Sequence, residues 1–217
     1  YPPFPPFSLL YYCSLIYAPL FERSHTMKEN AFTCLIPCPQ SFITNGDTIL
    51  PAKIHPAHEL TNEIAGAANL ILKPWLTSAT DAVKMDFILN PSFITAKTKK
   101  LKPDLRRQSY KLVTGRKMSA LIAPDISGLR HGMQTLRQIL EDAKNGMIPE
   151  LIIEDWPCLE WRGIHVDLAR EMEYRHDHLL KVVEHLAYLK MNVLHLYLEN
   201  KFAYPSAPEV APPRVMT

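Results

Sequence analysis

The alternation of apolar and polar residues predicts a sheet-rich first part of the chain with two helices. Short or alternating apolar runs predict strands at 32–36, 82–89, 108–113, 118–123 and 151–153. Helical spacing predicts a helix over 61–72, with Thr61 or Asn62 as its N-cap, and a second helix with Ser127 as its N-cap. The second helix carries an apolar stripe of Leu129, Met133, Leu136 and Leu140. This order is typical of a two-layer α+β domain.

The pattern changes to strand, helix, strand after Pro157. Because Pro157 lacks an N–H and favours an extended Trp156, residues 155–157 are predicted to be a connector. Three elements follow, namely a strand over 162–169, a helix over 177–190 with Asn192 as its left-handed cap, and a strand over 193–198. This unit implies two parallel strands, which need further chain to complete a sheet. We therefore expect one apolar face of the strands to lack partners: Ile164, Val166, Val193, Leu194 and Leu196.

Composition narrows the functional classes without choosing one. The chain has 217 residues, 47% of them hydrophobic, and a formal net charge of +2. This near-neutral balance gives no electrostatic footprint for nucleic acid or an anionic membrane. The basic run from Lys97 to Arg107 is expected to be a solvated loop rather than a phosphate-binding patch.

The cysteines predict neither a metal site nor a disulfide framework. The four are Cys13, Cys34, Cys38 and Cys158. Cys34 and Cys38 have the spacing of half a zinc site, but no second Cys or His pair completes it. We expect reduced thiols, no metal and no organic cofactor, and such thiols favour a cytoplasmic setting over an exported one.

Residues 1–26 differ from the rest of the chain. They open with a proline-rich run, and the apolar stretch Ser8–Leu20 is too short to span a bilayer. No positive charge precedes that stretch, and the first methionine is Met27. We expect an unstructured leader, either a degraded export signal or a non-native extension, and the compartment stays open.

Polar residues follow both strands of the second part. Asp167 and Arg170 close the first strand, and Glu199 and Asn200 close the second. In a β/α barrel the reacting groups lie at the carboxyl ends of the strands, so these residues predict a binding face. The alternative is that Asp167 and Arg170 pair with each other and only neutralise a loop.

Three runs of the chain, in this order, resemble glycoside hydrolase family 20, the β-N-acetylhexosaminidases. The runs are Gly128–Leu140 followed by 148–149 and 155–157, then Trp161–Arg170, then Tyr188–Leu196. The resemblance covers roughly residues 33–217. It implies an α/β protein with a small α+β N-terminal domain (a sheet with two helices) over 27–157. The first β-α-β of an incomplete TIM (β/α)8 barrel would then occupy 158–217.

The resemblance also implies an activity and roles for named residues. The family removes terminal N-acetylhexosamine residues from glycans by substrate-assisted retaining hydrolysis. Arg162 matches the arginine that binds hydroxyls of the terminal sugar, and its alternative role is an anchor of the interdomain junction. The other matching residues are expected to hold the pocket: Asp167, Arg170, His195 and Glu199. His195 is equally expected to be a buried core histidine.

The chain departs from the family pattern in three ways. Glu171 stands where the family commonly has histidine, and His195–Asn200 replaces the family's His-x-His-Leu-x-Asp, which predicts a divergent branch. The catalytic Asp-Glu pair of a later strand is absent, so we expect the 217-residue chain to be inactive by itself. The alternatives are a non-enzymatic carbohydrate- or protein-interaction module, and another barrel glycosidase of the α-glucuronidase or O-GlcNAc hydrolase type.

Overall fold

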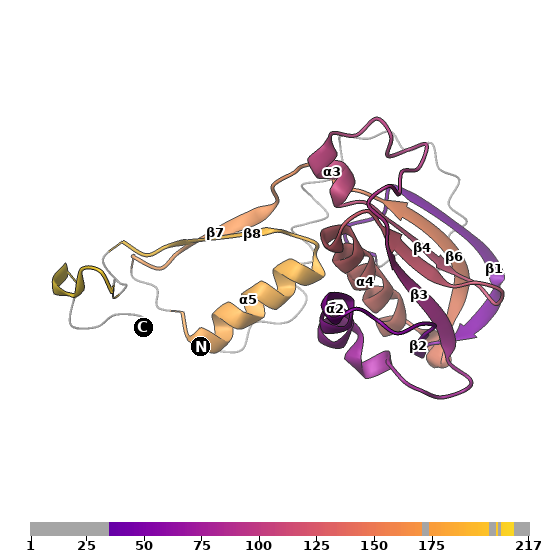
Figure 1. Cartoon of the computed structure of the whole chain (residues 1–217). Helices are drawn as coiled ribbons and strands as arrows, with labels where there is room; N and C mark the ends of the chain where they lie inside the picture. The colour runs from indigo at the N-terminus through magenta and orange to yellow at the C-terminus, as the bar shows by residue number, and fades with distance from the viewer. Residues whose placement is uncertain (1–34, 171–173, 200–202, 204, 211–217) are drawn as a thin grey trace. The chain divides into compact units, whose positions relative to one another are not determined.

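The computed structural model describes residues 35–170, 174–199, 203 and 205–210 (Figure 1). The expected leader at 1–26 lies outside the described residues, as do Cys34, Glu171 and Asn200. Among the described helices, none combines the length and apolarity that a bilayer crossing requires.

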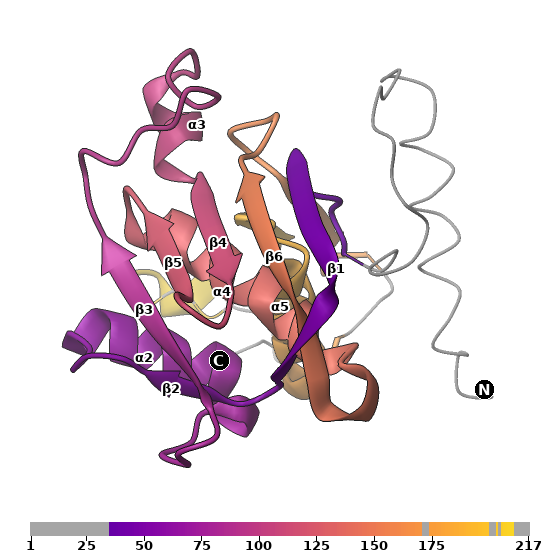
Figure 2. The same cartoon turned by 90° about the vertical axis from the view of Figure 1, so that its right-hand side faces the viewer.

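A mixed six-stranded sheet forms the larger part of the described chain. Its strands, in chain order, are β1 (Ser41–Pro51), β2 (Ile54–Pro56), β3 (Val83–Leu89), β4 (Tyr110–Thr114), β5 (Ala120–Ala123) and β6 (Met147–Asp155). They lie in the order β1-β6-β4-β5-β3-β2 across the sheet (Figure 2). The pairs β1–β6, β6–β4 and β4–β5 are antiparallel, whereas β5–β3 and β3–β2 are parallel.

Two helices, α2 (Asn62–Leu72) and α4 (Ile126–Glu141), cover one face of this sheet (Figure 2). The predicted stripe of α4 faces the core, since Leu129, Met133 and Leu136 have no exposed surface. The described chain also has a short helix α3 (Pro103–Arg107) and 3₁₀ turns at 73–75, 144–146 and 208–210. The predicted sheet with two covering helices is therefore confirmed as a mixed α/β fold.

Two sequence predictions about local structure were wrong. In the described part of 32–36, Leu35 and Ile36 form no strand, and the first strand begins at Ser41 instead. The N-cap of α4 is Asp125, whose Oδ1 accepts the Ser127 backbone N–H at 2.9 Å. The Ser127 hydroxyl also donates to Asp125, so Ser127 lies inside the first turn.

The second part of the chain is a two-stranded parallel sheet, β7 (Gly163–Asp167) and β8 (Val193–Tyr197), joined by α5 (His176–Tyr188). One face of the strands packs against α5 in a cluster around Val166, Leu168 and Leu179. The expectation of an apolar face without partners was therefore wrong for Val166, because the crossover helix itself covers it, whereas Ile164 is 37% exposed. Leu194 and Leu196 pack against the same cluster.

A buried polar network joins the six-stranded sheet to the turn after α5. Lys190 Nζ lies 3.0 Å from Asp155 Oδ2 and 3.0 Å from the Tyr110 hydroxyl, and all three residues are buried. Tyr110 donates to Asp155 at 3.0 Å, and burial together with the Asp155 charge raises the pKa of Tyr110 well above its ordinary value. Lys190 has the left-handed φ of 58° that was predicted for Asn192. Lys190 thus adopts an unfavourable backbone conformation, and its ammonium group lies in the network.

His131 lies beside this network on α4. Its Nδ1 is 3.2 Å from the Gln108 carbonyl oxygen. Burial lowers the pKa of His131 from 6.5 to about 4; the hydrogen bond to Gln108 opposes this shift, and the charges of Arg162 and Lys190 add to it. His131 is therefore neutral in the folded chain at neutral pH.

We expect the free energy of unfolding to fall as the pH drops from 6.5 toward 4. Across this window His131 binds a proton in the unfolded state but not in the folded state. The loss reaches up to about 1.4 kcal/mol per pH unit. Urea denaturation at several pH values measures this slope. The free energy of unfolding of the His131→Asn variant should depend on pH less steeply by this amount. Equal slopes for the two proteins would contradict the prediction.

Candidate functional site at the carboxyl ends of β7 and β8

The register of β7 and β8 determines which polar side chains meet. Asp167 is the partner of Tyr197 at the carboxyl ends of the strands. His165 is the partner of His195 two residues earlier, on the same face. The residues of the other face pack on α5. One face of the strand pair is therefore polar and the other is apolar.

Asp167 shapes the turn that follows β7. Its Oδ1 accepts the backbone N–H of Ala169 at 2.9 Å and of Arg170 at 3.3 Å, and Arg170 Nη1 lies 3.8 Å from Oδ2. The Arg170 side chain is 73% exposed. The structure thus brings the two predicted residues together, with the guanidinium accessible at the end of the strand.

Tyr197 and Glu199 lie at the matching end of β8. The Tyr197 hydroxyl donates a hydrogen bond to Glu199 Oε1. That hydrogen bond is the main cause that raises the pKa of Tyr197. The Arg170 guanidinium carbon lies 5.9 Å from the centroid of the Tyr197 ring. We call Asp167, Arg170, Tyr197 and Glu199 the rim cluster.

Sequence reasoning missed Tyr197 and His165. Both could have been found from the strand register, since equal steps along two parallel strands place Asp167 beside Tyr197 and His165 beside His195. His195, expected in a pocket or in a core, is exposed in the described chain. Its Nδ1 lies 3.0 Å from that of His165.

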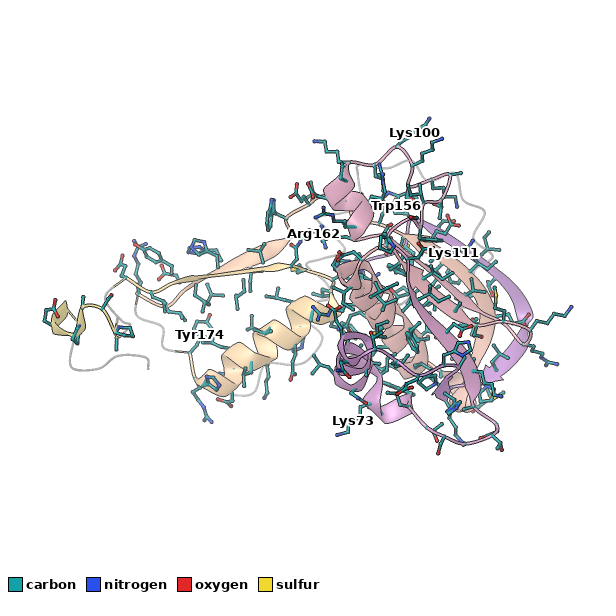
Figure 3. The ribbon with its side chains drawn as sticks, in the orientation of Figure 1. Lys73, Lys100, Lys111, Trp156, Arg162 and Tyr174 are labelled. Carbon is teal, nitrogen blue, oxygen red and sulfur yellow. The ribbon has the colours of Figure 1, made fainter. Side chains whose placement is uncertain are left out.

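Arg162 lies directly before β7 (Figure 3). It is therefore at the other end of this strand from Asp167. Its guanidinium donates to the carbonyl oxygens of Leu159 at 2.6 Å and Lys190 at 2.8 Å, and to Gln108 Oε1 at 2.8 Å. These partners come from both sides of the connector at 155–157, so the geometry favours the alternative role of a junction anchor. Its predicted role in binding sugar hydroxyls stays a prediction.

The rim cluster has the chemistry of a site for a polar, hydroxyl-rich ligand. The carboxylates of Asp167 and Glu199 accept hydrogen bonds, whereas the Arg170 guanidinium donates several. The Tyr197 ring also offers an apolar face. Within the described part of the chain, no group of three or more His, Cys, Asp or Glu side chains is placed to hold a metal ion.

Comparison with known families places these features in a class. Residues 35–156 match the profile of "Glycosyl hydrolase family 20, domain 2", and residues 159–213 match that of "Glycosyl hydrolase family 20, catalytic domain". The described fold is thus that of a glycosidase family with a carbohydrate-cleaving catalytic domain. The chain belongs to glycosyl hydrolase family 20.

Curated relatives agree with this assignment. Over 95 residues the chain is 35% identical to a beta-N-acetylhexosaminidase of Cellulomonas fimi. This match covers 43% of this chain and 19% of the relative. Over 101 residues it is 38% identical to a beta-hexosaminidase of Akkermansia muciniphila. This second match covers 45% of this chain and 20% of the relative. The chain thus matches about a fifth of the length of these relatives.

A solved structure shares the fold. The exo beta-N-acetylglucosaminidase of Vibrio harveyi in complex with N-acetylglucosamine has a TM-score of 0.61 and 21% sequence identity. The match covers 81% of this chain and 28% of that chain. At this identity the likeness concerns the fold alone.

Proposed function

We propose that this chain is part of a β-N-acetylhexosaminidase that removes terminal N-acetylhexosamine residues from glycans. The observation that carries the proposal is the order of the two family 20 matches, domain 2 over residues 35–156 followed by the catalytic domain over residues 159–213. In this proposal residues 27–157 are the N-terminal domain, and 158–217 supply the first strands of a TIM barrel. The reaction is substrate-assisted and retaining, with a catalytic Asp-Glu pair on a later strand.

The rim cluster is proposed to line the sugar-binding end of that barrel. Support comes from its position, because barrel enzymes bind their substrates at the carboxyl ends of the strands. The face opposite α5 would turn toward the barrel interior, since the helices of such a barrel lie outside. Arg170 and Asp167 would then hydrogen-bond ring hydroxyls or the groups that hold them, and Glu199 would orient Tyr197.

Hydrolysis of 4-nitrophenyl N-acetyl-β-D-glucosaminide tests the proposal. We expect the complete gene product to release nitrophenol and the 217-residue chain to release none. In the complete product, Arg170→Gln should lower kcat/KM by about tenfold or more, as expected for loss of a charged hydrogen bond. The matched control is Arg175→Gln. It removes an exposed arginine directly before α5, whose Nε lies 2.9 Å from Asp177 Oδ1. Equal activity of the two variants would contradict the role of the rim cluster, and no activity in the complete product would contradict the function.

A further inference from the structure

We propose that His165 and His195 form a binding site for a divalent late transition-metal ion such as Zn²⁺. The two residues are direct partners on neighbouring parallel strands. Their Nδ1 atoms lie 3.0 Å apart, and their rings lie 4.6 Å apart at 85° to each other. Both side chains are exposed, on the face of the strands that does not pack against α5. The proposal concerns the 217-residue chain and does not require the proposed activity, although the proposed barrel would turn the same face toward its interior.

The separation of the two nitrogens suits chelation of one ion. With Zn–N bonds of about 2.0–2.1 Å, two ligands of a tetrahedral shell lie about 3.3 Å apart, and adjacent ligands of a square-planar shell lie about 2.9 Å apart. The observed separation of 3.0 Å lies between these values. Rotation of the exposed imidazoles therefore aims both lone pairs at one ion without movement of the strands. Imidazole is also a preferred ligand of Zn²⁺, Cu²⁺ and Ni²⁺.

The protonation of the pair is compatible with metal binding. A direct hydrogen bond between two Nδ1 atoms requires one ring to carry its proton on Nδ1 and the other to offer a lone pair. In the metal-bound form both rings carry the proton on Nε2, so the donor ring changes only its tautomer. Solvent can exchange this proton because both rings are exposed.

The protein supplies two ligands to this site. Asp167 is next on the same face, but its carboxylate already accepts the N–H groups of Ala169 and Arg170. No set of three His, Cys, Asp or Glu side chains converges anywhere in the described residues. Water would therefore complete the coordination shell, so the affinity should be well below that of a four-ligand structural zinc site.

Isothermal titration of the metal-free chain with ZnCl₂ tests the proposal. Chelation by two linked ligands should give the tightest site of the chain, and His165→Gln or His195→Gln should weaken that site on the order of 10²-fold. The double variant should bind no more weakly than either single variant, because loss of one histidine already ends the chelation. His185→Gln is the matched control, since His185 is an exposed histidine on α5 whose Nδ1 lies against the Lys181 carbonyl. The affinity of the tightest Zn²⁺ site should be the same in His185→Gln as in the wild type.

Two outcomes would overturn the proposal. One is a tightest Zn²⁺ site whose affinity is the same in the wild type and in His165→Gln or His195→Gln. The other comes from imidazole ¹⁵N spectra of the wild type, a measurement that needs no variant: Zn²⁺ should shift the Nδ1 resonances of both histidines together, and a shift of only one or of neither would exclude a shared ion.

Discussion

Replacement of Lys190 by methionine is expected to lower the free energy of unfolding by about 3–5 kcal/mol, the usual cost of leaving one member of a buried ion pair without its partner. Lys190 and Asp155 are both buried, with Nζ and Oδ2 3.0 Å apart. The variant leaves the Asp155 carboxylate buried without its cation. Urea denaturation followed by tryptophan fluorescence measures this loss of stability, since Trp156 and Trp161 lie between β6 and β7.

The coupling of the pair separates this effect from simple loss of packing. The double variant Lys190→Met, Asp155→Leu should be less destabilised than the sum of the two single variants, because no buried charge remains. Lys181→Met is the matched control, an exposed lysine of α5 whose loss should change stability by no more than about 0.5 kcal/mol. Strict additivity of the two single changes would contradict the account of the network.

Gly163→Ala is expected to destabilise the chain by about 3 kcal/mol, because overpacking against backbone atoms cannot be relieved by a side-chain rotation. A Cβ atom at this position would lie 2.0 Å from the Val193 carbonyl oxygen and 2.6 Å from the Val193 Cβ. Gly163 and Val193 are the first paired residues of β7 and β8. The added methyl group would force apart the strands that carry the rim cluster.

Gly66→Ala provides the matched control. Gly66 lies within α2, and a Cβ atom there would meet nothing within 4 Å. Alanine should therefore stabilise the helix by about 0.5–1 kcal/mol. Thermal unfolding of the two variants should give shifts of opposite sign. A Gly163→Ala variant as stable as the wild type would show that β7 and β8 do not approach as closely as described.

Local patterns were sufficient for most of the secondary structure. The predicted strands at 82–89 and 193–198 correspond to β3 and β8, and the predicted helix at 61–72 corresponds to α2, because each has a clear apolar period. β1 was missed because Asn45, Gly46 and Asp47 are typical turn residues. The register of β1 against β6 shifts between Thr44 and Ile49, and this irregularity accommodates them within a strand.

The candidate site was predictable only where sequence neighbours form it. Asp167 and Arg170 are three residues apart, and the sequence offered their pairing as the alternative to a binding face. The network of Tyr110, Asp155 and Lys190 joins residues up to 80 positions apart, so no local pattern indicates it. The contacts of Arg162 depend on the same long-range packing, since Gln108 lies 54 positions away. Long-range contacts therefore determined which partners Arg162 and Lys190 have.

The reading frame of the message that encodes Thr217 tests the central claim most directly. If the chain is part of a β-N-acetylhexosaminidase, the frame continues beyond this codon through further β/α units and an Asp-Glu pair at the end of a later strand. A stop codon directly after Thr217 in the native message would contradict the claim, because the protein would then lack the groups that orient the acetamido group and protonate the leaving oxygen.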